Sequence, residues 1–285
     1  MQRRVEAALE QRLPGAQIAP ARLHEAMRYA TLGGGKRVRP LLTFAAGELA
    51  DAGIDQVEIA ACALECVHVY SLVHDDMPCM DDDALRRGKP TVHVQYDEAT
   101  ALLVGDALQT LTFELISAPG AFNDPARHLR AIAVLAKATG SRGMAGGQAI
   151  DLASVGQVLN RTELEFMHIH KTGALIRASV LLGALAGNIG EAQLDKLDHF
   201  GKCIGLLFQV VDDILDTEAD TATLGKTAGK DAANNKPTYV SIIGLADAKN
   251  LALELAAEAR DTLAEFGDGA LRLRELTDYI VHRPF

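Results

Sequence analysis

Two short segments of this chain concentrate carboxylate side chains. The first, DDMPCMDDD, covers residues 75–83, and the second, DDILD, covers residues 212–216. Each follows a long apolar segment, so several like charges meet beside a low-dielectric interior and repel one another. A solvated acidic helix end would explain either cluster alone. Two such clusters favour divalent cations, and ligand sets made only of oxygen atoms favour magnesium over zinc.

The spacing within each cluster predicts how its side chains are presented. Asp212 and Asp216 are four residues apart, so they project from one face of a helix. Asp75 and Asp81 are six residues apart, which a regular helix would place on different faces. Pro78 lies between them and cannot continue helical hydrogen bonding. We therefore expect a loop at Pro78 that brings Asp81 back toward Asp75.

Basic segments accompany both clusters. The segment GGGKRVRP, residues 33–40, joins a flexible backbone and several cations to the start of an apolar helix, which suits an anion. It lacks the spacing of a P-loop, and so does the LGKT segment at residues 224–227, which disfavours nucleotide phosphoryl transfer. Magnesium on one side and Lys or Arg on the other is the arrangement that two diphosphate groups require. Further cations near the clusters are Arg86, Arg87, Lys171, Lys226, Lys230 and Lys236.

The elements that position these residues are predicted to be helices. Residues 57–76, 100–117, 175–187 and 192–216 are long apolar runs, and residues 246–266 are amphipathic. Strand alternation flanked by turn signals is hard to find. No Ser/Gly-rich linker divides the chain, so residues 1–285 are expected to form one all-α domain.

Composition narrows the functional class. The formal net charge of -10 argues against a nucleic-acid partner. The chain has no run of eighteen apolar residues and begins without the apolar core of a secretory signal, so we expect no membrane span. Cys62 and Cys66, one helical turn apart, could form a thiol pair or half a metal site, but buried free thiols in a reducing cytoplasm are the favoured interpretation.

Six segments together resemble the short-chain trans-prenyl diphosphate synthases, and most of all the bacterial farnesyl diphosphate synthases. They are GGGKRVRP, YSLVHDDMPCMDDDALRRGKPT, GGQAIDL, HKTGALI, FQVVDDILD and LGKTAGKDAANNKPTY, in the family's order and spacing from about Leu32 onward. The resemblance implies a bundle of about ten helices around a deep central cavity, in a homodimer. It also implies a magnesium-dependent prenyltransferase with three magnesium ions in each active site.

The same resemblance assigns roles to individual residues. Asp75, Asp81 and Asp212 match magnesium ligands, and Asp216 matches a ligand acting through water. The residues matched to catalysis are Lys171, Thr172, Gln209, Asp76 and Asp213, with Thr172 and Gln209 beside the forming carbocation.

The remaining matched residues bind substrate or support the metals. Arg86, Lys171 and Lys226 match residues that hold the allylic diphosphate, and Lys236 matches a loop lysine over the site. The matched isopentenyl diphosphate residues are Lys36, Arg39, His68 and Arg87, and those behind the metals are Gln148 and Asp151. The C-terminus carries a single basic residue, Arg283, where some relatives have a basic cluster, so no closing role is expected for the tail.

The expected reaction is head-to-tail (1'-4) condensation of isopentenyl diphosphate with dimethylallyl or geranyl diphosphate. Ionisation, condensation and proton elimination would give farnesyl diphosphate. The growing tail should lie along the helix that ends at Asp75, where each residue adds ~1.5 Å of depth. Tyr70 can close this tunnel five residues below Asp75, with Ser71 leaving room beside it. The alternative functions are a geranylgeranyl diphosphate synthase, a terpene cyclase and a non-catalytic subunit of a heteromeric synthase. The alternative role for Tyr70 is that of an ordinary core aromatic.

Overall fold

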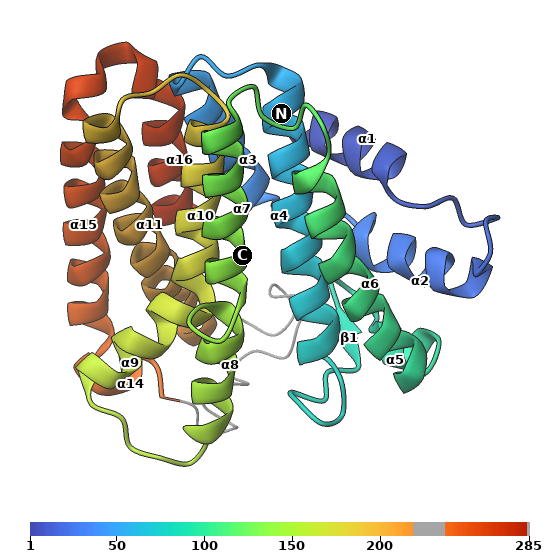
Figure 1. The fold of residues 1–285 in the computed structure, drawn as a ribbon. Helices are drawn as coiled ribbons and strands as arrows, with labels where there is room; N and C mark the ends of the chain where they lie inside the picture. Colours follow the sequence, from blue (N-terminus) through green and yellow to red (C-terminus); the bar gives the residue numbers. More distant parts are fainter. Residues whose placement is uncertain (219–236, 284–285) are drawn as a thin grey trace.

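The protein folds as a bundle of long helices, seen in a computed structural model that describes residues 1–218 and 237–283 (Figure 1). Lys226, Lys230 and Lys236 lie outside the described residues. The all-helical prediction is confirmed. The elements are α1 (Gln2–Arg12), α2 (Ala21–Thr31), α3 (Val38–Leu49), α4 (Ile54–Asp75), β1 (Leu85–Arg86), β2 (Lys89–Pro90), α5 (Val92–Gln95), α6 (Glu98–Ser117), α7 (Pro125–Thr139), α8 (Met144–Ala153), α9 (Arg161–His168), a π-helix (Ile169–Gly173), α10 (Ala174–Leu185), α11 (Glu191–Glu218), α14 (Tyr239–Ile243), α15 (Leu245–Thr262), a 3₁₀-helix (Ala264–Ala270) and α16 (Leu271–His282).

Helix α4 lies at the centre of the bundle. Its sequence is apolar around most of its circumference, which is typical of a helix covered on every side. Helices α3, α6 and α10 pack directly on it, and α1 and α2 cover its outer side (Figure 1). The four apolar runs expected at residues 57–76, 100–117, 175–187 and 192–216 correspond to α4, α6, α10 and α11, so these predictions are confirmed.

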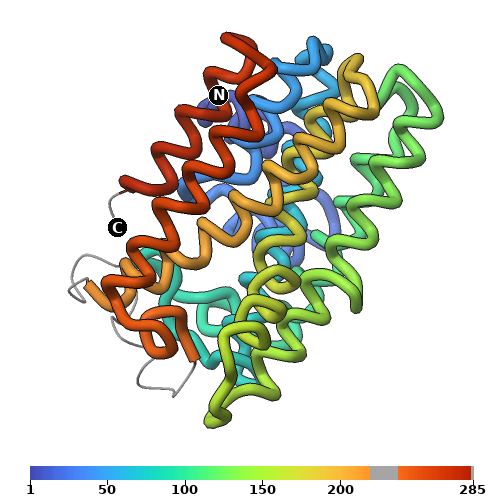
Figure 2. The backbone as a smooth tube through the Cα atoms, turned by 90° about the vertical axis from the view of Figure 1, so that its left-hand side faces the viewer, coloured from blue at the N-terminus to red at the C-terminus, as the bar shows by residue number. Residues whose placement is uncertain are grey.

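Helices α11, α15 and α16 form the opposite side of the bundle from α1 and α2. Figures 1 and 2 show α15 and α16 running beside α11, and the contacts between these helices agree. The amphipathic run expected at residues 246–266 is shorter as a regular helix, because α15 ends at Thr262 and a 3₁₀ turn continues it. Gly267 supplies the left-handed φ of 53° that reverses the chain toward α16.

A single π-helical turn interrupts the passage from α9 to α10. It spans Ile169–Gly173 and therefore contains both Lys171 and Thr172. A π turn adds one residue to the regular helical register, and such turns are frequent at functional sites because they redirect side chains. In this protein the turn packs against α8 and α11, which brings two segments that are distant in sequence to Lys171 and Thr172.

Two helices pass the length and hydropathy test for a membrane span, namely α4 and α6. Helix α4 is the buried centre of the bundle, and core helices commonly pass this test. Helix α6 packs on α4 along one side and exposes the other. The four cysteines are free thiols, and Cys62 and Cys66 are both buried, as the sequence predicted.

Candidate active site

A cavity of about 890 Å³ lies at the end of the bundle where α4 stops. In Figure 1 this is the end that carries the β1 hairpin, α8, α9 and α14. Residues of α3, α4, α8, the π turn and α11 line it, together with the chain after α16. Most of the predicted site residues are among the lining: Lys36, Arg39, His68, Tyr70, Ser71, Asp75, Arg86, Arg87, Gln148, Lys171, Thr172 and Asp212.

The first carboxylate cluster folds back on itself as its sequence predicted. Helix α4 ends at Asp75, and the chain then turns through Pro78. The backbone N–H of Asp81 donates to the Asp75 carbonyl at 2.8 Å, and the N–H of Asp83 donates to the Asp76 carbonyl at 3.1 Å. The loop therefore holds residues 75 and 81 next to each other.

Asp76 turns away from the cavity and fixes Arg86. Its carboxylate is only 3% exposed and accepts hydrogen bonds from Arg86 Nε at 2.8 Å and from Arg86 Nη2. This paired geometry is the strong form of the arginine–carboxylate contact. The short β1–β2 hairpin, with Gly88 at a φ of 73°, places Arg86 opposite Asp76. Asp76 therefore orients a cation that lines the cavity.

Asp213 performs a comparable supporting role in the second cluster. It is 3% exposed, accepts from Gln209 Nε2 at 2.9 Å and accepts from the backbone N–H of Tyr239 at 2.8 Å. Thr172 Oγ1 in turn donates to Gln209 Oε1 at 3.2 Å. This chain of bonds links the start of α14, helix α11 and the π turn, and it fixes the oxygen atoms of Thr172 and Gln209 relative to each other.

Lys171 is held by Asp151. Its ammonium donates to Asp151 Oδ2 at 2.6 Å, and the carboxylate is 5% exposed. The backbones of α8 and the π turn approach very closely here: a Cβ added to Gly147 would lie 2.0 Å from the backbone nitrogen of Lys171. Any larger side chain at Gly147 would displace Lys171. Asp151, predicted from the resemblance, thus lies directly behind a cation of the cavity wall.

Three of the predicted isopentenyl diphosphate residues, Arg39, His68 and Arg87, lie close to one another at the cavity. Arg87 donates to the carbonyl of Gly34, which places it against the glycine-rich loop. Burial and the neighbouring charges of Arg39 and Arg87 hold the pKa of His68 well below its usual range, so its imidazole is neutral at pH 7. Arg39 Nε is buried without a hydrogen-bond partner in the described part of the chain. Such a group needs an anion or water to satisfy it.

Arg37, in the same basic segment, serves the fold. Its guanidinium is 3% exposed, donates to Glu6 Oε1 at 2.7 Å and to the Thr31 carbonyl at 2.6 Å, and pairs with buried Glu65. This network anchors the glycine-rich loop to α1 and α4, because all five guanidinium donors need partners once buried. Within GGGKRVRP, Arg37 is thus committed to the fold, while Lys36 and Arg39 line the cavity.

The C-terminal tail reaches the site, although its single basic residue had predicted no closing role for it. Arg283 lines the cavity and donates to the Asp212 carboxylate. Its guanidinium lies 3.8 Å above the centre of the Phe208 ring and is 3% exposed. A lone arginine suffices here, because the Phe208 ring supports its buried charge.

The carboxylates fit a divalent cation. Burial raises the pKa of Asp75 to about 6, with nearby Asp81 adding to the rise and Lys171 opposing it. Lys171 and Arg86 compensate the charge of Asp75 only in part, and a bound cation would add to that compensation. Their donors are all carboxylate oxygens, the type that magnesium prefers. Asp212 and Asp216 lie one turn apart on α11, so the second cluster presents two carboxylates from one face of that helix.

Tyr70 lines the cavity from α4, five residues before Asp75. It is 7% exposed, and its ring meets the ring of His74 edge to face at 5.9 Å between centroids. Burial raises the pKa of the Tyr70 hydroxyl, and a hydrogen bond with Gln109 of α6 opposes that rise. Contacts with α4 and α6 neighbours thus fix the ring in place, and Ser71 lines the cavity beside it.

Comparisons with known proteins agree with this geometry. Residues 20–265 match the polyprenyl synthetase family, and the chain belongs to that family. A probable farnesyl diphosphate synthase of Bradyrhizobium diazoefficiens is 50% identical over 281 residues, covering 96% of this chain and 83% of that protein. The large subunit 1 of a chloroplastic heterodimeric geranylgeranyl pyrophosphate synthase of Arabidopsis thaliana is 47% identical. That match covers 98% of this chain and 76% of the Arabidopsis protein. The structure of a Helicobacter pylori geranyltransferase complexed with magnesium and isoprenyl diphosphate matches with a TM-score of 0.85 and 37% sequence identity. The match covers 98% of this chain and 93% of that one.

Proposed function

We propose that this protein is a magnesium-dependent farnesyl diphosphate synthase. The observation that carries the proposal is the shared cavity: Asp75 and Asp212 line it from two helices, and several cations line the same cavity. Two separate groups of cations support two diphosphate substrates, an allylic one at Arg86 and Lys171 and isopentenyl diphosphate at Lys36, Arg39 and Arg87. Names of relatives that include farnesyl diphosphate synthase support the same activity.

The residues of the chain divide the work of the reaction. Magnesium, when bound by Asp75, Asp81, Asp212 and Asp216, would neutralise the charge on the leaving diphosphate. Arg86 and Lys171, oriented by Asp76 and Asp151, hold that diphosphate in position. The oxygens of Thr172 and Gln209, fixed by Asp213, stabilise the allylic cation as its carbon–oxygen bond breaks.

The second substrate supplies the electron pair. The double bond of isopentenyl diphosphate attacks the allylic carbon, a new carbon–carbon bond forms, and the proton lost from the adduct passes to the released diphosphate. Apolar residues in the cavity wall, among them Leu72, Met144 and Phe208, exclude the water that would otherwise capture the cation. We propose that three magnesium ions act in each site, as the resemblance implies.

Product length is proposed to be set by Tyr70. Its ring lies in the cavity wall below Asp75 and is fixed by neighbours on α4 and α6, so it can stop the growing tail. Relatives named geranylgeranyl pyrophosphate synthase are 47–49% identical to this chain, which keeps that longer product as the second candidate. Both candidates use the same chemistry and differ only in the depth of the tunnel.

The test is chromatography of dephosphorylated products from wild type, Tyr70→Ala and Tyr70→Phe. The fifteen-carbon alcohol should dominate for wild type and for Tyr70→Phe, which keeps the ring. Tyr70→Ala should add a twenty-carbon alcohol, because the tunnel deepens by roughly one isoprene unit. A wild-type enzyme making mainly the twenty-carbon alcohol would establish the geranylgeranyl candidate. Identical products from all three would show that Tyr70 does not close the tunnel.

A non-catalytic subunit is the less favoured assignment from another functional class. Such a subunit would be expected to lose one carboxylate cluster, whereas both clusters are intact and meet at one cavity. Release of diphosphate by the purified chain alone, with magnesium, decides between the two assignments.

We further propose that the enzyme is a cytoplasmic homodimer joined through α6. Leu102 and Leu103 are consecutive residues of α6, and their side chains are 49% and 53% exposed. Apolar side chains exposed next to each other favour a covered surface. Light scattering after gel filtration should give twice the chain mass of 30.4 kDa. Leu103→Glu should give the monomer. The control Leu253→Glu, at an exposed position of α15, should still give the dimer. A monomeric wild type would contradict the proposal.

A further inference from the structure

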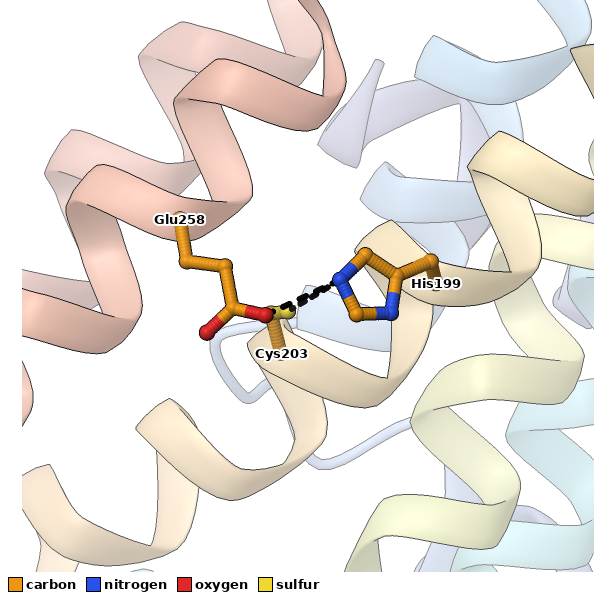
Figure 3. Close-up of side chains that lie close together, drawn as sticks. All are labelled: His199, Cys203 and Glu258. Carbon is orange, nitrogen blue, oxygen red and sulfur yellow. Dashed lines mark hydrogen bonds and ion pairs between the residues drawn. The ribbon is translucent and has the colours of Figure 1, made fainter.

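Three metal-ligating side chains meet outside the active-site cavity, between α11 and α15 (Figure 3). His199 and Cys203 lie one helical turn apart on α11, and Glu258 reaches them from α15. The His199 Nε2, Cys203 Sγ and Glu258 carboxylate oxygen all lie within 4.8 Å of one another. None of these residues lines the cavity described above.

The distances are close to those of a tetrahedral metal site. His199 Nε2 lies 2.9 Å from Glu258 Oε1 and 3.9 Å from Cys203 Sγ. Around a tetrahedral zinc ion, with Zn–N near 2.0 Å and Zn–S near 2.3 Å, neighbouring donors are about 3.3–3.6 Å apart. Metal binding would need these donors to shift, and His199 and Glu258 have the freedom to do so because both are exposed side chains.

Burial differs among the three ligands in a way that suits an ion arriving from solvent. Cys203 is 5% exposed and forms the floor, whereas the side chains of His199 and Glu258 are 52% and 54% exposed and form the rim. The nearest cation along the helix, Lys202, pairs with Asp198 at 2.8 Å. An ion held here would keep one open coordination position toward water.

We propose that His199, Cys203 and Glu258 bind a thiophilic divalent transition metal, with Zn²⁺ as the expected ion. A sulfur, a nitrogen and a carboxylate oxygen form the mixed set that zinc prefers, and magnesium is excluded because it binds hard oxygen ligands. A cysteine ligand binds as the thiolate, so binding releases the Cys203 proton to solvent as the metal–sulfur bond forms.

The site would couple the two helices that support the second carboxylate cluster. Cys203 precedes Asp212 by nine residues on α11, about 13.5 Å along the axis. Helix α15 follows α14, whose Tyr239 N–H donates to Asp213. A metal at His199, Cys203 and Glu258 thus fixes α15 to α11 on the outer side of the bundle, at a site separate from the proposed magnesium site.

Titration with Co²⁺, in excess Mg²⁺ to occupy the carboxylate clusters, tests the proposal. A sulfur-to-cobalt charge-transfer band should appear with one equivalent in the wild type, and Zn²⁺ should abolish it by displacement. Cys203→Ser should lose the band. His199→Gln and Glu258→Gln should weaken Co²⁺ binding roughly tenfold or more, since each removes one of three protein ligands. Glu254→Gln, one turn away on α15, and Cys79→Ser, which removes an exposed thiol, are the matched controls and should keep the band.

Two results would overturn the assignment. One is the absence of a charge-transfer band in folded wild-type protein at saturating Co²⁺. The other is a band that survives Cys203→Ser, or one unaffected by both His199→Gln and Glu258→Gln. The last two variants change exposed side chains, so they decide the question even if Cys203→Ser fails to fold. As an independent measurement, Zn²⁺ should raise the thermal midpoint of wild type and not that of Glu258→Gln.

Discussion

In each carboxylate cluster the first aspartate lines the cavity and the second is buried, although the two clusters lie at different places in their helices. Asp75 and Asp212 line the cavity, whereas the following residues, Asp76 and Asp213, are each 3% exposed and bind the protein itself. The first cluster lies where α4 ends and the chain turns back, and the second lies within the last turns of α11. In both, the second carboxylate bonds to the protein and the first faces the cavity, where Asp212 also pairs with Arg283.

Their partners differ in distance along the chain. Asp76 binds Arg86, ten residues further on, within the same loop and hairpin. Asp213 binds the backbone of Tyr239, twenty-six residues away, and Asp212 binds Arg283, seventy-one residues away. The first cluster is therefore organised by local structure, while the second depends on the C-terminal helices packing correctly.

The largest expected effect tests the shared function of the clusters. Asp75→Ala and Asp212→Ala should each reduce kcat by about 10³-fold, roughly 4 kcal/mol of transition-state stabilisation, because each removes a ligand of the leaving-group metal site. Steady-state diphosphate release measures the rate, and circular dichroism confirms the helical content.

The matched control for this pair is Asp82→Asn, an exposed acid of the same loop whose φ of 49° asparagine tolerates. It should stay within about twofold of wild type. If Asp75→Ala or Asp212→Ala kept more than about a tenth of the wild-type rate, a loss under ~1.4 kcal/mol, the metal assignment would be wrong.

A smaller effect separates the two supporting aspartates. Asp76→Asn should lower the free energy of unfolding by about 3 kcal/mol, because it leaves the Arg86 guanidinium beside a buried neutral group. Asp213→Asn should cost about 1–2 kcal/mol, since an amide oxygen can still accept one of its two bonds. Urea unfolding of the metal-free protein measures both. A greater loss for Asp213→Asn would break the contrast between local and long-range organisation.

The smallest effect concerns the long-range partner of Asp212. Arg283→Ala should lower the magnesium concentration needed for half-maximal activity by roughly three- to tenfold, about 1 kcal/mol, because the guanidinium competes with a metal for the same carboxylate. Arg272→Ala, an exposed cation on α16 paired with Glu275, is the control and should leave that concentration unchanged. A higher magnesium requirement for Arg283→Ala would contradict this competition and indicate instead that Arg283 supports the metal-bound active site.

Local sequence patterns were enough to predict helices α4, α6, α10, α11 and α15, both carboxylate clusters and the turn that joins Asp75 to Asp81. Helical periodicity and the effect of Pro78 act over a few residues, so a chain segment carries them without its neighbours. The resemblance placed most of the cationic residues at one cavity, as the structure has them, and its assignments of Lys226 and Lys236 lie outside the described residues.

Contacts between distant segments were decided only by the tertiary structure. Sequence spacing gave no sign that Arg283 reaches Asp212, that a π turn carries Lys171 and Thr172, or that Glu258 completes a cluster with His199 and Cys203. Each of these depends on how α11 packs against helices that precede or follow it by tens of residues. Burial then determines which carboxylates bond to the protein, as Asp76 and Asp213 do, and which face the cavity, and burial depends on the packed bundle rather than on any single segment.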